Sequence, residues 1–450
     1  MKTLLIFFLL ILSFTSKAAE KPNIVIILLD DAGYGDFHPF GTPPYPTPNV
    51  QELADQGARF NNFYVPQSSC SASRSALLTG SYPGRTGVFG AHSPNALGLP
   101  TKFPTLAEVL KSAGYSTAHF GKWHIGDQPE TRPLSRGFDE HAGLMYSNDM
   151  WRFHPVNPEK WSKFPLQFWE NGKVKIKDIS KKDQAQLTTW ATEKSVDFIK
   201  RNKDKPFFLY VAHSMPHVPL FCSKKFLGKS TVGLYGDVIM EIDWSVGQIH
   251  KTIKESGIER KTMIIFTSDN GPWTLYGNHG GKTPFREAKG TSFDGGIKSP
   301  LIIKYPPLIK AGNVSNSTFF SIDLFPTITK LTGAKLPKRE IDGKDITPLL
   351  TTEENRLGPQ AYYAITMNKN LEAIMSGDGR WKLHLPHKYR KVFFKGKDGS
   401  AGKYTHPKIK FSLFDLKNDP YEKNNVIKHN PAVANELKKW AKVHLKKFYR

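Results

Sequence analysis

The chain has 450 residues, of which 39% are hydrophobic and 23% charged, and no stretch of it is of low complexity. This composition excludes a disordered, collagenous or coiled-coil protein and indicates a globular one with a sizeable core. Lysine and arginine outnumber aspartate and glutamate by 63 to 40, a formal net charge of +23 that favours contact with polyanions. The two cysteines, Cys70 and Cys222, are too few for a disulfide scaffold.

The first residues have the features of a secretory signal. One lysine precedes an apolar run at residues 4–14, and the small residues Ser16 and Ala18 then form a cleavage site. The run is too short to span a bilayer comfortably, and no later stretch is long and apolar enough. We therefore predict a signal peptide at residues 1–19, a secreted or periplasmic protein of charge about +21, and no stable membrane anchor. The polyanions available there are sulfated or carboxylated polysaccharides and membrane surfaces, and we expect no nucleic-acid partner.

Four short apolar runs each stop at polar residues, a pattern typical of strands buried on both faces of a parallel sheet. They cover residues 23–29, 114–120, 206–212 and 262–267. Helical patterns lie between them at residues 47–57, 103–114, 184–201 and 235–256. The alternation of strands and helices predicts a doubly wound α/β core, in which ligands bind outside the carboxyl ends of the strands.

After about residue 336 the pattern changes to short strands separated by turns. The expected strands cover residues 361–365, 373–376, 381–385 and 412–416, and an amphipathic helix follows at residues 432–448. This order predicts a small antiparallel sheet with one helix. We therefore divide the mature chain into a large α/β domain at residues 20–335 and a C-terminal α+β subdomain at residues 336–450.

Two of the predicted strands end in paired oxygen-bearing side chains, Asp30-Asp31 after the first and Asp269-Asn270 after the fourth. Ligand sets made of oxygen alone suit Ca²⁺ or Mg²⁺ better than Zn²⁺. Either pair alone is also compatible with an ordinary turn at a strand end. Because both pairs are expected at one edge of the sheet, we predict that they hold a divalent cation together.

Cys70 begins a Ser- and Ala-rich segment that is predicted to be a short helix ended by Gly80. A helix N-terminus favours negative charge, so this position suits a reactive group. The alternative is a buried structural cysteine, a common environment for this residue.

The segment Cys-Ser-Ala-Ser-Arg at residues 70–74 resembles the Cys-x-Pro/Ala-x-Arg signature of type I, formylglycine-dependent sulfatases. Further segments similar to that family, all in its order, are DDAGYGD at 30–36, GKWH at 121–124, YSNDM at 146–150, PHVP at 216–219, SDNG at 268–271 and KGTSFDGG at 289–296. The resemblance covers residues 21–421 and is closest to the arylsulfatase A-like branch. It implies an alkaline phosphatase-like fold, with a large mixed sheet flanked by helices and a small C-terminal antiparallel sheet with a helix.

The resemblance also implies the chemistry of a sulfatase. Cys70 would be converted to formylglycine, the nucleophile, and one Ca²⁺ per chain would be held by Asp30, Asp31, residue 70, Asp269 and Asn270. The catalytic residues would be Cys70, Arg74, Lys122, His124, His217 and Lys289. Among these, Arg74 and Lys122 would hold the nucleophile, His124 would act as a base and His217 would protonate the leaving alcohol. Lys289 and Ser147 would contact the sulfate. Conversion requires a formylglycine-generating or an anaerobic maturation enzyme, and Ala72, where many members have proline, is compatible with both.

Substrate preference is expected to come from aromatic and basic side chains near the predicted site, since aromatic rings pack on sugars and basic groups bind sulfates. The candidates are Ser147, Trp151, Arg152, His154, His279 and Arg286. The alternative for residues 146–169 is an insertion whose aromatic side chains pack on the core. The predicted function is hydrolysis of sulfate esters on oligosaccharides from a sulfated polysaccharide. Two alternatives are a phosphatase or phosphodiesterase of the same superfamily, and a non-catalytic protein that binds polyanionic glycans.

Overall fold

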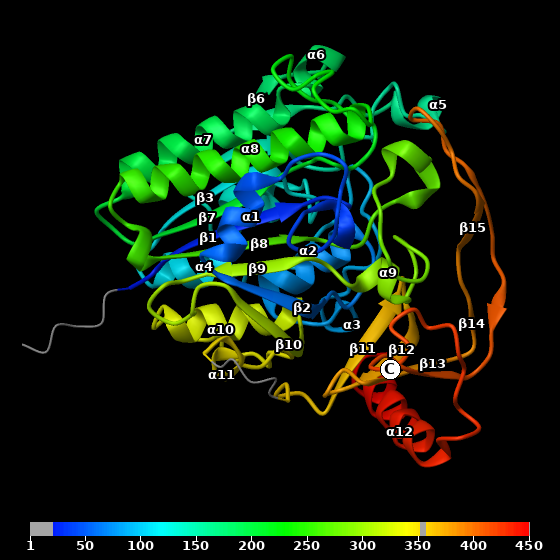
Figure 1. Ribbon diagram of the computed structural model, residues 1–450. Coiled ribbons are helices and arrows are strands. Elements are labelled where there is room, and N and C mark those ends of the chain that lie inside the picture. The colour runs from blue at the N-terminus through cyan, green and yellow to red at the C-terminus, as the bar shows by residue number, and fades with distance from the viewer. Residues whose placement is uncertain (1–20, 352–356, 450) are drawn as a thin grey trace, which may run out of the picture.

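The computed structural model describes residues 21–351 and 357–449, so the predicted signal peptide lies outside the described residues (Figure 1). A ten-stranded mixed sheet crosses the molecule. Its strands, in spatial order, are β10 (Asn313–Phe320), β2 (Ala58–Tyr64), β9 (Leu301–Lys304), β8 (Thr262–Ser268), β1 (Asn23–Leu29), β7 (Phe207–Ala212), β3 (Ser116–Lys122), β4 (Glu140–Leu144), β5 (Phe168–Glu170) and β6 (Lys173–Ile176).

The centre of this sheet is parallel. From β8 through β1, β7 and β3 to β4, every neighbouring pair runs in the same direction, and these include all four strands predicted from the sequence. The strand predicted at residues 114–120 ends two residues later than expected, because Gly121 and Lys122 continue β3. A Cβ on Gly121 would lie 1.9 Å from the carbonyl oxygen of Ala212, so glycine allows β3 and β7 to approach closely here.

Helices cover both faces of the sheet, as the doubly wound prediction requires. One face is covered by α1 (Pro48–Asp55), α7 (Leu187–Asn202) and α8 (Leu234–Glu255). The other is covered by α2 (Cys70–Thr79), α4 (Leu106–Ser112) and α10 (Leu324–Leu331) (Figure 1). Alternate residues of β1 enter the two cores, with Val25 and Ile27 facing α8, and Ile24 and Ile26 facing the α4 layer.

Shorter helices connect these layers. They are α3 (Pro83–Thr86), α5 (Pro158–Trp161), α6 (Lys181–Gln184), α9 (Asp294–Ile297) and α11 (Thr347–Leu350), with 3₁₀ helices η1 (Tyr34–Asp36), η2 (Pro129–Thr131), η3 (Pro133–Arg136), η4 (Glu259–Lys261), η5 (Thr274–His279) and η6 (Ser321–Asp323). Within the described residues, no helix combines the length and the apolar character needed to cross a bilayer.

The C-terminal part forms the predicted small antiparallel sheet, made of β11 (Tyr362–Met367), β12 (Asn370–Ser376), β13 (Trp381–His384) and β18 (Ser412–Asp415). The helix α12 (Pro431–Phe448) packs on it through Ala434, Leu437 and Ala441. The ten-stranded mixed sheet with its helices, together with this smaller sheet, is the alkaline phosphatase-like fold that the sequence led us to expect.

An additional feature, which the sequence did not predict, is a long two-stranded extension of this part. It pairs β14 (His387–Lys388) with β17 (Lys408–Ile409), and β15 (Lys391–Phe394) with β16 (Lys403–Thr405). We call residues 387–409 the basic ribbon. In Figure 1 it is the orange segment that rises along one side of the molecule. Its tip is held by the backbone, because Gly396 and Gly402 both donate to the carbonyl of Leu275 in η5, at 2.8 and 2.9 Å.

A buried ionic network joins the two sheets. The ammonium of Lys382 lies 2.6 Å from Asp294 Oδ1 and 2.8 Å from Glu422 Oε1, and all three side chains are at most 1% exposed. Glu422 also accepts the backbone N–H of Asp294 at 2.7 Å and faces His384 Nε2 at 3.1 Å. The segment that leads into α9 is therefore fixed to the C-terminal sheet by paired charges that water does not reach.

Removing one member of this network should destabilise the fold strongly. We expect Glu422→Ala to lower the free energy of unfolding by about 3–5 kcal/mol, because it leaves a buried lysine with one partner fewer. Urea or thermal unfolding measures the change. The matched control is Glu255→Ala, which breaks the exposed pair with Lys251 and should cost less than about 1 kcal/mol. Equal effects of the two substitutions would contradict a structural role for the network.

Candidate active site

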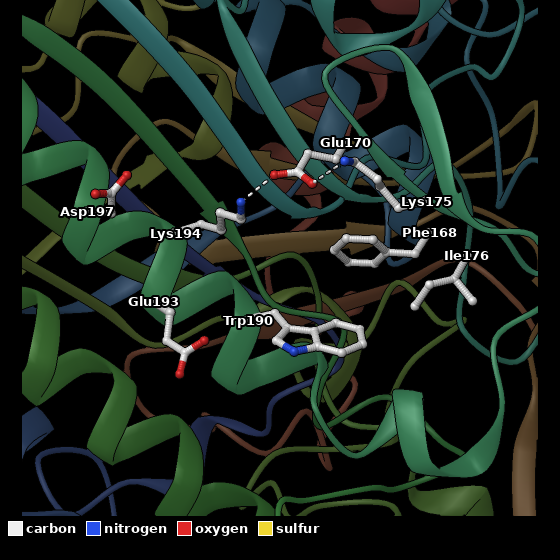
Figure 2. Close-up of a pocket in the computed structure, with 8 residues that line it drawn as sticks. All are labelled: Phe168, Glu170, Lys175, Ile176, Trp190, Glu193, Lys194 and Asp197. Atoms are coloured by element: carbon white, nitrogen blue, oxygen red, sulfur yellow. Dashed lines mark hydrogen bonds and ion pairs between the residues drawn. The ribbon is translucent and has the colours of Figure 1, made fainter.

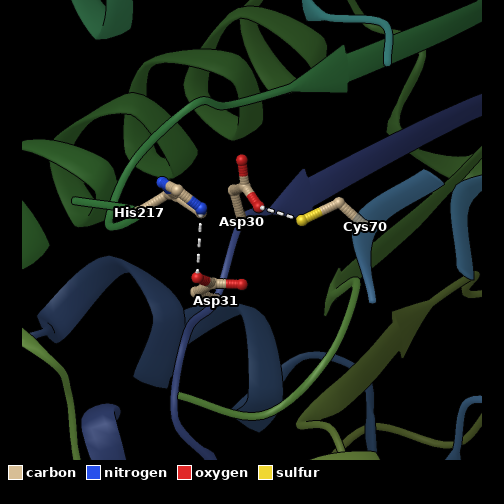
Figure 3. A group of neighbouring side chains, drawn as sticks. All are labelled: Asp30, Asp31, Cys70 and His217. Atoms are coloured by element: carbon tan, nitrogen blue, oxygen red, sulfur yellow. Dashed lines mark hydrogen bonds and ion pairs between the residues drawn. The ribbon is translucent and has the colours of Figure 1, made fainter. Parts of the chain in front are cut away.

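The polar residues that follow the central strands meet at one edge of the sheet, in front of the first turn of α2. Asp30 and Asp31 follow β1, Asp269 follows β8, Lys122 is the last residue of β3, and His217 lies in the loop after β7. The helix α2 begins at Cys70 and is ended by Gly80 in a left-handed conformation, as predicted. Figure 3 shows how Cys70 and His217 approach the two aspartates from different sides.

The thiol of Cys70 is 1% exposed and lies among charged groups. Its Sγ is 3.4 Å from Asp30 Oδ1 and 3.4 Å from the ammonium of Lys289. Lys122 forms an ion pair with Asp30 and donates to Ser147 Oγ at 3.0 Å. The residue at position 70 is therefore surrounded by the groups that the sequence assigned to the same site.

Arg74, one helical turn after Cys70, closes the buried side of this cluster. Its Nε donates to Asp269 Oδ2 at 2.9 Å, and its Nη1 donates to the carbonyl of Lys122 at 2.7 Å. Its Nη2 lies 3.7 Å from Asp30 Oδ2 and has no hydrogen-bond partner among the described residues. Arg74 thus connects the ends of β1, β3 and β8 behind the thiol.

Asp31 organises the other side of the cluster. Its carboxylate accepts from Lys289 at 2.7 Å and from the amide nitrogen of Asn270 at 2.7 Å, and it lies 3.5 Å from His217 Nε2. Asp31 is in the left-handed region with φ of 65°, a conformation that strains a non-glycine residue. The surrounding contacts hold this strained backbone, and they keep the carboxylate facing the thiol.

The donor atoms at this site fit a divalent cation. One ligand atom each from Asp30, Asp31, Cys70 and His217 lie within 4.8 Å of one another, and Asp269 accepts the backbone N–H of Asp31 at 3.2 Å. The side-chain oxygen of Asn270 is buried without a hydrogen-bond partner within the described part of the chain, although its nitrogen is bonded. A buried amide oxygen without a donor, beside converging carboxylates, has the position and chemistry of a cation ligand.

Burial and charge together set the ionisation of these groups. Burial acts to raise the pKa of Asp30, but Lys122, His217, Arg74 and Lys289 hold it well below its usual value. Burial and the charge of Asp30 raise the pKa of Asp269 to about 7. Burial and Asp30 also raise the pKa of the Cys70 thiol. Asp30 is therefore more firmly ionised than Asp269.

The two histidines of the predicted catalytic set present different nitrogens to the site. His217 Nδ1 lies 2.5 Å from the carbonyl of Val218, which places a proton on Nδ1 and leaves Nε2 to exchange protons with the cavity. His124 Nε2 lies 2.9 Å from the carbonyl of His92, so Nδ1 is left as an acceptor, buried and unpaired among the described residues. Burial lowers the pKa of both imidazoles.

A cavity of about 450 Å³ opens over Cys70. Of the predicted residues, Cys70, His124, Ser147, His217 and Lys289 line it. Arg74, Lys122, Asp30, Asp31, Asp269 and Asn270 are fully or almost fully buried beneath or beside them. The structure thus brings all the predicted catalytic and cation-binding residues together.

Most of the predicted substrate-binding residues do not line this cavity. Trp151 is 1% exposed and packs edge-to-face on Phe221, so the aromatic insertion faces the core here. Arg152 forms an ion pair with Asp178.

The other three are held elsewhere as well. The ring of His154 accepts two backbone N–H groups of its own loop, and His279 lies beside Gly399 at the tip of the basic ribbon. Arg286 stacks 4.1 Å from the ring of Phe293 and donates to the carbonyl of Glu422. Ser147 is the one member of the six that lines the cavity.

Further residues form the rest of the wall, and the sequence analysis missed most of them. Two of them, Asp149 and Trp273, come from loops of the main sheet, and Trp273 stacks on Lys289 at 4.5 Å. Many of the others come from the C-terminal part, namely Met367, Asn368, Asn370, Glu372, Lys388, Tyr389, Arg390 and His406. The dense run of lysine and arginine after residue 387 was the available signal, but nothing in the sequence showed that the ribbon returns to the site.

A second cavity, of about 420 Å³, lies between α7 and the edge strands β5 and β6 (Figure 2). Phe168, Ile176 and Trp190 form its apolar part. Its two lysines are paired, because Glu170 binds both Lys175 and Lys194, as Figure 2 shows. No cysteine or histidine lines it.

Comparison with known proteins identifies the family to which the chain belongs. The model of the family described as Sulfatase matches residues 22–334, and that described as N-sulphoglucosamine sulphohydrolase, C-terminal, matches residues 288–383. The chain is 37% identical to N-acetylgalactosamine-6-sulfatase of Mus musculus over 390 residues, which cover 82% of this chain and 72% of the relative. It is 35% identical to arylsulfatase A of Bos taurus over 445 residues, covering 93% and 86%.

Solved structures show the same fold. The PsFucS1 sulfatase from Pseudoalteromonas sp. matches with a TM-score of 0.85 and 28% identity, covering 96% of this chain and 91% of that one. Ps i-CgsB, solved in complex with k-i-k-neocarrahexaose, matches with a TM-score of 0.77 and 28% identity, covering 94% and 93%. With its sequence match, its fold and the cluster around Cys70 in agreement, the chain belongs to the sulfatase family, in the arylsulfatase A-like branch, and is a sulfuric ester hydrolase.

Proposed function

We propose that this chain is a secreted or periplasmic sulfatase that removes sulfate from oligosaccharides of a sulfated polysaccharide, with formylglycine at position 70 and one bound Ca²⁺. The proposal includes a cleaved signal peptide at residues 1–19, a maturation enzyme that converts Cys70, and a division of the mature chain near residue 335. The observation that supports it best is the set of groups around the Cys70 thiol.

The charges at this site are balanced without a ligand. Arg74, Lys122 and Lys289 face Asp30, Asp31 and Asp269, so the formal charges of these six groups cancel. A buried neutral cluster gives little net attraction to a sulfate monoester, whereas one added divalent cation makes it positive. The cation would be held by Asp30, Asp31, Asp269, Asn270 and residue 70, and it would supply a Lewis acid for a sulfate oxygen.

The side chains around residue 70 are placed for the remaining tasks. Formylglycine supplies a nucleophile in place of the thiol. Lys122 and Arg74 hold position 70, while the ammonium of Lys289 and the hydroxyl of Ser147 face the cavity where the sulfate would bind. His217 Nε2 is the proton donor to the leaving alcohol, and His124 Nδ1 is the base.

A direct assay tests this function. Purified enzyme with a converted residue 70 is given 4-nitrophenyl sulfate and 4-nitrophenyl phosphate, and kcat/KM is measured for each. We expect the sulfate ester to be preferred by at least about 100-fold, because the described residues form one cluster of potential metal ligands and no second one. A preference for the phosphate ester would favour the phosphatase alternative. Absence of both activities would favour a glycan-binding protein.

Substituting His217 should separate two kinds of leaving group. An alkoxide of a sugar needs a proton as it departs, whereas a 4-nitrophenolate departs readily without one. We expect His217→Ala to lower kcat for a sulfated saccharide by about 10²–10⁴-fold and to lower kcat for the aryl sulfate much less. Steady-state kinetics on both substrates measures this difference. Equal losses on the two substrates would show that His217 does not act as the acid.

A further inference from the structure

The C-terminal part supplies one wall of the cavity, and among the described residues the cations of this wall have no anionic partner. Lys388 and Arg390 come from the basic ribbon, on either side of the buried Tyr389, and His406 comes from its returning strand. Within the described residues, neither Lys388 nor Arg390 forms a hydrogen bond or an ion pair. Lys122 and Lys289 differ from them, since each is paired with an aspartate.

Arg390 is held in a defined position although it has no anionic partner. Its guanidinium lies 4.9 Å from the ring of Tyr404, which in turn packs edge-to-face on His406. On its other side is Gly290, where an added Cβ would be 3.1 Å from Arg390 Nη1. Gly290 directly follows Lys289, so the guanidinium is adjacent to the loop that carries a predicted sulfate ligand.

The Nε atom of Arg390 is buried and unpaired in the part of the chain that the structure describes. A buried donor without an acceptor is costly, so an acceptor is expected to occupy the space beside it. A guanidinium presents its donors as a planar fork that matches a carboxylate or a sulfate. The unpaired donor therefore indicates an anionic group of the ligand.

Two carboxyl groups also line the cavity, and both already face a histidine. Asp149 lies 3.6 Å from His154 Nε2, and Glu372 lies 3.3 Å from His387 Nε2. Burial raises the pKa of Glu372 to about 7, which reduces its negative charge near neutral pH. The cations of the ribbon are consequently the uncompensated charges of this wall.

We propose that Arg390, supported by Lys388, forms a second anion subsite, which binds a carboxylate or sulfate of the same saccharide whose scissile sulfate lies at residue 70. The inference rests on the proposed function and narrows its substrate to saccharides with at least two anionic groups. Tyr404 and Gly290 position the guanidinium, and the cation at position 388 adds charge at the more exposed edge.

The test uses hydrolysis of 4-nitrophenyl sulfate as a reporter and measures its inhibition by saccharides. The inhibitors are disaccharides with one sulfate, with one sulfate and one carboxylate, and with two sulfates, each in several positional isomers. For the wild type we expect at least one of the dianionic compounds to have a Ki about 10–100-fold lower than its singly charged counterpart. Comparison of the carboxylate with the second sulfate identifies the anion that the subsite prefers.

Arg390→Ala should abolish this preference, and Arg390→Lys should retain part of it, because the charge remains without the fork. The matched control is Lys395→Ala, which removes the same charge from an exposed residue of the ribbon outside the cavity, and which should keep the preference. For each variant, the Ki of the dianionic saccharide is divided by that of its singly charged counterpart. A general change in turnover therefore does not affect this ratio.

A wild-type enzyme that hydrolyses the aryl sulfate but does not discriminate between the saccharides would overturn the subsite. An equal loss of preference in Lys395→Ala would also overturn it, since it would show that only the overall charge matters. If the wild type with a converted residue 70 did not hydrolyse the aryl sulfate, the proposed function itself would fail, and this outcome is distinct from the first two.

Discussion

Cys70→Ala is expected to abolish sulfatase activity while the protein remains folded. The thiol lines the cavity and is the precursor of the proposed nucleophile, and loss of a nucleophile typically costs more than about 10³-fold in kcat. The substitution removes one buried sulfur atom, so the free energy of unfolding should change by only about 1 kcal/mol. Activity on 4-nitrophenyl sulfate and urea unfolding measure the two effects.

Cys222→Ala is the matched control for this experiment. Cys222 is also buried, at 5% exposed, but it belongs to the core cluster beneath α8 and does not line the cavity. Its substitution should leave kcat within about 3-fold of the wild type. Mass spectrometry of the tryptic peptide that covers residues 60–74 should show the aldehyde or its hydrate in active enzyme. Full activity with an intact thiol would contradict the proposed nucleophile.

Removal of the cation should also lower sulfatase activity strongly. We expect dialysis against a chelator to lower kcat/KM for the aryl sulfate by more than about 10²-fold, because the remaining charges cancel and the sulfate loses its Lewis acid. Addition of Ca²⁺ should restore activity, and elemental analysis should give one Ca²⁺ per chain. Two Zn²⁺ per chain would favour the phosphatase alternative.

A second readout makes this prediction independent of turnover. A ligand that binds only the folded state at 100 times its Kd stabilises that state by about 2.7 kcal/mol. Ca²⁺ should therefore raise the unfolding midpoint of the wild type. It should have little effect on Asp30→Asn, which loses the carboxylate nearest to Cys70. A control is Asp55→Asn, an exposed residue of α1, in which the response to Ca²⁺ should be retained.

The sequence was sufficient to predict the centre of the fold. Strands buried on both faces have continuous apolar segments, and β1, β7 and β8 are such strands. The outer strands were missed because they lack this signal. For example, β2 alternates between polar and apolar residues, and β6 has only two apolar residues, Val174 and Ile176. Short edge strands are defined by the partner they pair with, and the sequence does not identify that partner.

The central residues of the candidate site were also predictable from the sequence, but the wall of its cavity was not. Residues that end parallel strands must meet at one edge, so the positions of Asp30, Lys122, His217 and Asp269 followed from the strand pattern together with the family resemblance. The wall of the cavity did not follow from it. Trp151 is an aromatic residue of a type that often packs on sugars, but here it is buried in the core. Arg390 belongs to a charged run of the kind that is usually exposed to solvent, but it lines the cavity. Both positions depend on long-range packing.

The order of strands in the main sheet has a consequence for synthesis of the chain. The first strand to be made, β1, ends at the centre of the sheet, and its partners β7 and β8 follow about 180 and 240 residues later. At about 5–20 residues per second, a ribosome needs roughly 10–50 s to reach β8 after β1. During this interval an apolar strand has two unpaired edges, a state that favours aggregation. The growing chain therefore has to be kept from folding or associating until more than half of it exists.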